Sequence, residues 1–148
     1  MAKFIYRMQS VLNIKEKLEE QAKNEFAQAR QRLDAELSKM EKLHERKRGY
    51  EEESVALREE VLDIQKIADN QYALDRMDEY IAAQQTEVVK AQRDLEYARE
   101  NLTKAMQESK IHNKLKEKAF EQFKKDLVAQ ESKEIDELTS FRYGQKEE

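Results

Sequence analysis

Apolar and small residues recur at alternating intervals of three and four positions through residues 74–105. This spacing is the a/d pattern of a heptad repeat, which is typical of a helix that packs along another helix. The other heptad positions are mostly charged or amide residues, so one helix cannot bury this stripe by itself. The stripe, called the seam below, comprises Leu74, Met77, Ile81, Gln84, Val88, Ala91, Leu95, Ala98, Leu102 and Ala105.

A second helical pattern precedes the seam. From Leu18 to Met40, apolar residues are spaced by four, four and three positions, and these steps repeat. An eleven-residue repeat corresponds to about 3.67 residues per turn, which predicts a nearly straight or slightly right-handed helix. The positions are Leu18, Ala22, Phe26, Ala29, Leu33, Leu37 and Met40.

The two patterns predict an all-α fold in which two long helices form an antiparallel coiled-coil hairpin. We expect one helix over about 3–60, a connection within 60–72, and a second helix over about 73–142, in a single elongated domain spanning 1–148. Asp69-Asn70 offers the most favourable turn chemistry, and Gly144 is expected to close the second helix. The alternative is one long helix that dimerises; intramolecular pairing is favoured by its high effective concentration.

Composition supports a fold with few turns. The 148 residues include two glycines and no proline, and turns draw on both. With 41% charged residues the chain could also be disordered. Disordered chains do not hold a/d spacing over such a length, so the periodicity favours the coiled coil. Gly49 interrupts the first helical pattern. A glycine inside a helix can kink it, fray it or be tolerated, and the sequence leaves these three alternatives open.

Charge and residue types exclude several classes of function. The net charge is only −4, whereas a general nucleic-acid binder carries a large positive excess. The chain has no cysteine, which fits a reducing compartment. It has no apolar run approaching the ~18 residues of a membrane span, and its N-terminus lacks the apolar core of a signal peptide. We therefore expect a soluble cytoplasmic protein.

No pattern of catalytic or metal-binding residues is present. There is no Gly-rich phosphate loop, and the two histidines, His44 and His112, have no ligand spacing. A two-helix rod also lacks a cavity that could exclude water. The sequence predicts neither an enzyme nor a bound cofactor or metal, and favours a scaffold, chaperone or coupling rod.

Two blocks near the ends resemble the FliJ family, the stalk component of the flagellar type III export ATPase complex. The first contains Phe4, Tyr6, Arg7, Met8, Val11 and Leu12, followed by Glu20 and Ala22. The second is the basic stretch within 108–118, followed by Lys133-Glu134-Ile135-Asp136-Glu137. The resemblance covers nearly the whole chain. It implies a rod similar in architecture to the γ stalk of rotary ATP synthases.

The resemblance implies contacts with three kinds of partner: the ring of the export ATPase FliI, the export gate protein FlhA, and export chaperones. The paired termini would enter the ATPase ring, through Phe4, Tyr6, Arg7, Val11, Leu12, Ile135, Asp136, Glu137, Phe141 and Arg142. A gate-binding stripe would lie on Met77, Ile81, Gln84 and Val88, flanked by Tyr72 and Tyr80. The alternative for this stripe is that it simply faces the first helix.

The function expected from the resemblance is that of a non-enzymatic coupling rod at the flagellar base, cytoplasmic and only peripherally associated with the membrane. It would promote assembly and activity of the ATPase. A stand-alone cytoplasmic chaperone or adaptor, or a structural tether, remains the alternative for a charged coiled coil.

Overall fold

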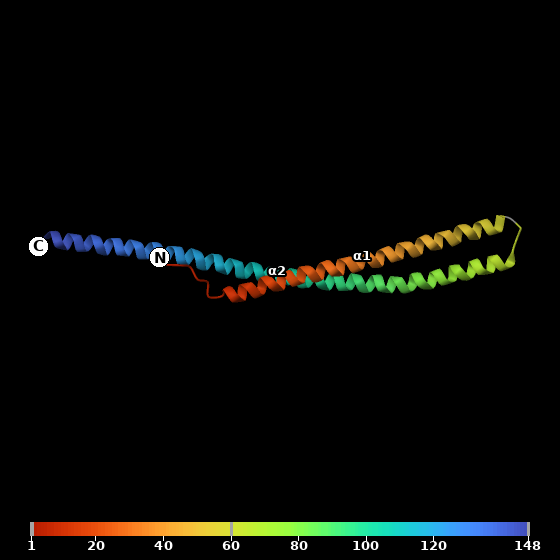
Figure 1. Ribbon diagram of the computed structural model, residues 1–148, viewed down its shortest axis with the longest axis horizontal. Helices are drawn as coiled ribbons and strands as arrows, with labels where there is room; N and C mark the ends of the chain where they lie inside the picture. Colours follow the sequence, from red (N-terminus) through yellow and green to blue (C-terminus); the bar gives the residue numbers. More distant parts are fainter. Residues whose placement is uncertain (1, 60, 148) are drawn as a thin grey trace. The chain divides into compact units, whose positions relative to one another are not determined.

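The computed structural model describes residues 2–59 and 61–147, and side chains as far as Gln145. In it the chain forms two long helices. Helix α1 spans Gln9–Glu59 and helix α2 spans Ile64–Glu147, and no strand occurs among the described residues. The two helices pack against each other in antiparallel fashion, which confirms the predicted coiled-coil hairpin (Figure 1).

The start of α2 is set by Asp63 and not by the expected turn at Asp69-Asn70. The Asp63 carboxylate accepts hydrogen bonds from the backbone N–H groups of Gln65 (3.1 Å) and Lys66 (3.3 Å), as an N-cap residue does. Asn70 lies inside the helix, where its amide donates to the Tyr50 carbonyl of α1 at 2.9 Å. The second helix therefore begins at Ile64 instead of near residue 73, because the capping residue comes earlier than the polar pair.

The first helix begins at Gln9, later than the expected start near residue 3. The Gln9 N–H donates to the Tyr6 carbonyl at 3.1 Å, closing a turn that leads into the helix. The Phe4 ring packs against the rings of Phe120 and Phe123, with centroid separations of 5.1 and 5.5 Å. This contact with a distant part of the chain favours a non-helical course that local periodicity does not reveal.

The C-terminal end of α2 also differs from expectation. The helix continues through Gly144 to Glu147 instead of ending near residue 142. Gly144 does not have a positive φ, so the expected left-handed cap is not formed there.

The structure divides into two compact units, and the first, Gln21–Leu102, is called the connection unit. Every seam position from Leu74 to Leu102 is buried or half-buried, which confirms the seam in this unit. Ion pairs of α1 with α2, Arg32–Asp94 at 2.6 Å and Lys47–Asp78 at 2.8 Å, flank it. Exposed ion pairs add little stability, so apolar burial must hold the helices together. The buried apolar residues are Ala22, Met77, Val88, Ala91 and Ala98.

The second unit, Met1–Glu20 with Thr103–Glu148, is called the terminal unit. Its core is thin: Leu12 of α1 is 1% exposed, and Ser109 of α2, four positions beyond the last seam residue Ala105, is also buried. Lys15 Nζ lies 2.8 Å from Glu108 Oε2, joining α1 to α2 beside this core. The pairing is antiparallel here too, since Phe4 contacts Phe120 and Lys15 contacts the earlier residue Glu108.

The helix passes through Gly49 without interruption. Gly49 has no positive φ, and a Cβ placed there would meet no atom within 4 Å. We expect Gly49→Ala to raise the free energy of unfolding by about 0.5–1 kcal/mol, because alanine loses less backbone entropy in a helix. Urea denaturation measures the gain. Gly144→Ala, near a helix end that frays, should gain less; a loss of stability in Gly49→Ala would contradict a regular helix at this position.

Candidate partner-binding surfaces

The predicted gate-binding stripe lies largely in the interface with α1. Met77 is 2% and Val88 3% exposed, and Ile81 and Gln84 are half-buried. The Gln84 amide donates to the backbone carbonyl of Glu36 at 2.9 Å and also to the Glu36 carboxylate. Most of this stripe therefore serves the hairpin, which was the alternative for these residues.

Glu36 is held in its ionised form by this contact. The hydrogen bond from Gln84 lowers the pKa of the Glu36 carboxyl, and Lys39, with Nζ 3.5 Å from Glu36 Oε1, adds to the effect. In the terminal unit, the hydrogen bond and charge of Lys15 lower the pKa of Glu108 in the same way. Both carboxylates thus link the two helices as charged groups.

A shallow groove opens beside Gln84. Leu43 and Arg46 of α1 line one side, and residues of α2 line the other, so a partner docking here would touch both helices. The groove includes one residue of the predicted gate stripe and one of its aromatic neighbours. The α2 residues are Tyr80, Ala83, Gln84 and Glu87.

Tyr80 also belongs to an exposed aromatic row on α2. Tyr72 is 65% and Tyr80 45% exposed. The Arg76 guanidinium lies between them, 5.8 Å from the Tyr72 ring centroid and 5.7 Å from that of Tyr80. Residues spaced by four positions share one helix face, so the three side chains form a continuous aromatic and cationic surface.

The N-terminal residues of the predicted ATPase contact pack within the terminal unit. Leu12 is in its core, and Phe4, Tyr6 and Val11 are half-buried. Arg7 is the exposed member of this set. The N-terminal block is therefore partly committed to holding the chain against α2.

The C-terminal residues of the predicted contact are exposed. Ile135 is 62% and Phe141 63% exposed, and Asp136, Glu137 and Arg142 lie on the same uncovered part of α2. Phe4 reaches α2 at Phe123, and Ile135 lies roughly 18 Å farther along at ~1.5 Å per residue. The structure thus brings the two predicted halves of the contact into one unit but does not place them side by side.

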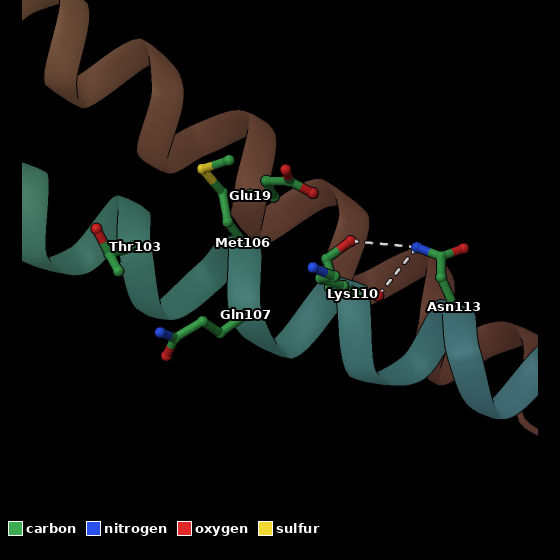
Figure 2. A pocket seen from close by; sticks show the side chains of 7 residues that line it. Glu19, Thr103, Met106, Gln107, Lys110 and Asn113 are labelled. Atoms are coloured by element: carbon green, nitrogen blue, oxygen red, sulfur yellow. Dashed lines mark hydrogen bonds between the residues drawn. The ribbon is translucent and has the colours of Figure 1, made fainter.

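A further groove, which the sequence did not indicate, lies along the terminal unit next to buried Ser109. Figure 2 shows Glu19 of α1 facing side chains of α2 across it. Asn113 Nδ2 donates to the Ser109 carbonyl at 2.9 Å, so this polar layer is satisfied internally. The α2 residues that line the groove are Thr103, Met106, Gln107, Ser109, Lys110 and Asn113.

The described residues offer no metal-binding cluster of three or more histidine, aspartate or glutamate side chains. In the same part of the chain, neither helix contains a segment long and apolar enough to cross a bilayer.

Comparison with protein families decides the relationship. The model of the family described as flagellar FliJ protein matches residues 4–148. The chain belongs to the FliJ family. It is therefore related to a component of flagellar protein export, as the end motifs predicted.

A solved structure supports the fold of this FliJ-family chain. A protein of Chlamydia trachomatis, described as a YscO homolog, superposes with a TM-score of 0.76 at 22% sequence identity. The match covers 95% of this chain and 96% of the other. At that identity the likeness shows a shared fold. A comparison with curated proteins finds no match.

The lowered pKa values predict sensitivity of the FliJ-family hairpin to acid. A carboxylate with a lowered folded pKa adds stability above its unfolded pKa, about 4.3 for glutamate, and this is lost as pH falls through the folded pKa. We expect the variant Glu36→Gln with Glu108→Gln to melt slightly lower at pH 7 but to lose less melting temperature between pH 6 and pH 3. The control is Glu53→Gln with Glu134→Gln, at exposed positions. If the unaltered chain, this variant and the control lost the same melting temperature between pH 6 and pH 3, the lowered pKa values of Glu36 and Glu108 would not be the cause of acid sensitivity.

Proposed function

We propose that this FliJ-family chain is a non-enzymatic stalk of the flagellar export apparatus, which contacts a FliI-like ATPase ring, a FlhA-like gate protein and export chaperones. It would act in the cytoplasm, peripherally at the membrane. The observation that carries the proposal is the C-terminal part of α2. There a helix of the terminal unit presents large apolar side chains to solvent: Val128, Ile135, Leu138, Phe141 and Tyr143.

Such a surface supports contact with a protein partner because exposed apolar side chains gathered on one element mark interaction sites. Asp136, Glu137 and Arg142 are interspersed with them and can set specificity through complementary charges. The N-terminal residues hold an earlier part of the same unit: Phe4 packs against Phe120 and Phe123 of α2, and Leu12 is buried. We therefore assign ATPase contact mainly to Ile135–Arg142 and a positioning role to the N-terminal block.

The ATPase contact can be tested without damage to the core. We expect Ile135→Ser with Leu138→Ser and Phe141→Ser to keep the helical signal and melting temperature, because these side chains are exposed. The variant should lose most stimulation of ATP hydrolysis by the purified cognate export ATPase, since a few apolar anchors carry most interface energy. Val55→Ser with Val61→Ser and Ile64→Ser, also exposed, is the matched control. Full stimulation by the tail variant would reject this end as the ATPase contact.

We place the gate contact on the same stretch as the predicted stripe but on its accessible side. Met77 and Val88 support the surface from within, and Ile81 and Gln84 border it. Tyr72, Arg76 and Tyr80 provide side chains that a partner can reach without opening the hairpin. Tyrosine and arginine are also the residue types that dominate binding energy at protein interfaces.

Two variants separate this gate contact from packing. Tyr72→Ala with Tyr80→Ala should leave melting nearly unchanged and abolish pull-down by the cognate gate protein's cytoplasmic region. Met77→Ala with Val88→Ala should instead lower the free energy of unfolding by about 2–5 kcal/mol, because both side chains are buried. Normal binding by the folded tyrosine variant would move the gate contact elsewhere.

A further inference from the structure

Among the described residues, no second helix lies beside the last part of α2 to cover its apolar side chains. The N-terminal segment reaches α2 at Phe120 and Phe123 through Phe4, and α2 extends beyond this point to Glu147 (Figure 1). All described side chains from Val128 to Gln145 are exposed. The uncovered apolar side chains, called the tail stripe, are Val128, Ile135, Leu138 and Phe141, each more than 60% exposed.

Charge is segregated along this same helix. Residues 110–125, the basic segment, contain six lysines and two glutamates, whereas residues 126–137, the acidic segment, contain five acidic residues and one lysine. Residues 4–15, which run along α2 from Phe123 back to Glu108, add Arg7 and Lys15 and contain no acidic residue.

Among the described side chains, the charged groups of these two segments form no ion pairs. In the part of the chain with described side chains, no carboxylate lies within ion-pair distance of Lys114, Lys118 or Lys125. The same holds for the acidic segment, where no basic group pairs with Glu131, Glu134, Asp136 or Glu137. In its described part, the chain therefore carries a basic segment without ion pairs next to an acidic segment without ion pairs, and the acidic segment overlaps the tail stripe.

We propose that the tail stripe is covered by a second copy of this chain, through antiparallel pairing of the C-terminal parts of two α2 helices. Antiparallel pairing sets the acidic segment of each copy against the basic segment of the other, twice and equivalently. Parallel pairing would set like charges together and is disfavoured. The arrangement is isologous, so it closes as a two-fold dimer and does not propagate.

The dimer has a consequence for assembly that rests on the proposed function. The tail stripe is also the proposed ATPase contact, so pairing with a second copy and binding to the ATPase exclude one another. The dimer would then be a reserve form in which the second copy covers the tail stripe until the ATPase replaces that copy.

The pairing is tested on the full chain alone, so the outcome does not depend on the ATPase. Two charge-reversed variants are compared by sedimentation equilibrium up to about 100 µM, at low and high salt. The acidic-segment variant carries Glu131→Lys, Glu134→Lys, Asp136→Lys and Glu137→Lys. The basic-segment variant carries Lys110→Glu, Lys114→Glu, Lys118→Glu and Lys125→Glu.

We expect the unaltered chain to dimerise at low salt. Each variant should have a dimer Kd at least tenfold higher than that of the unaltered chain. Mixing the two variants should restore a dimer, because the acidic-segment variant then has two basic segments and the basic-segment variant has two acidic ones. The matched control carries four reversals in the connection unit, at exposed positions, and should dimerise normally: Glu51→Lys, Glu52→Lys, Glu53→Lys and Glu59→Lys. Circular dichroism verifies that each variant is helical.

Three results would overturn the proposal. The first is an unaltered chain that stays monomeric over the whole concentration range, which would leave the tail stripe to a different protein. The second is a dimer that neither variant weakens, which would place self-association elsewhere. The third is a mixture of the two dissociated variants that fails to form the mixed dimer.

Discussion

The fold depends on burial of the seam of α2, which α2 cannot achieve as a single helix. A helix with one apolar stripe gains stability only from an element packed along it. Here the first half of the chain supplies that element, and the contact is thin because alanines occupy much of it. Ala91 is fully buried, and Ala22 and Ala98 are nearly so. Small side chains allow close approach but bury little area each, so the two helices must pair over many turns to be stable.

Two polar side chains, Gln84 in the seam and Asn70 just before it, fix which turn of α1 meets which turn of α2. Asn70 donates to the Tyr50 carbonyl, and Gln84 donates to the Glu36 carbonyl and carboxylate. A shift of register would leave these amides buried without partners, which is costly. A polar residue at a seam position commonly specifies register at some expense of stability. The same Gln84 borders the groove beside Tyr80, so the register-fixing layer also positions the surface that we assign to the gate partner.

The sequence predicted the parts of the fold that repeat and missed those that depend on single contacts. The seam and the hairpin follow from heptad spacing, which buried positions from Met77 to Ala98 confirm. The start of α2 was misplaced because Asp69-Asn70 and Asp63 have similar turn chemistry; Asp63 caps the helix, whereas the Asn70 amide donates to the Tyr50 carbonyl of α1. The non-helical course before Gln9 depends on Phe4 meeting Phe120, a contact between distant residues. For the candidate site, heptad spacing cannot distinguish a stripe that faces α1 from one that faces a partner, so the burial of Met77 and Val88 required the structure. Coverage of α2 in the terminal unit likewise depends on a contact between distant residues, that of Phe4 with Phe120 and Phe123.

Amide hydrogen exchange along α2 tests this dependence on helix pairing most directly. At low micromolar concentration, amides in residues 74–102, where α1 covers the seam, should exchange far more slowly than those in residues 128–145, where no helix covers α2. The difference is expected because an isolated helix of that length is only marginally stable in water, whereas paired segments open together. Uniform slow exchange to residue 145 under these conditions would contradict the account, as would fast exchange within residues 74–102.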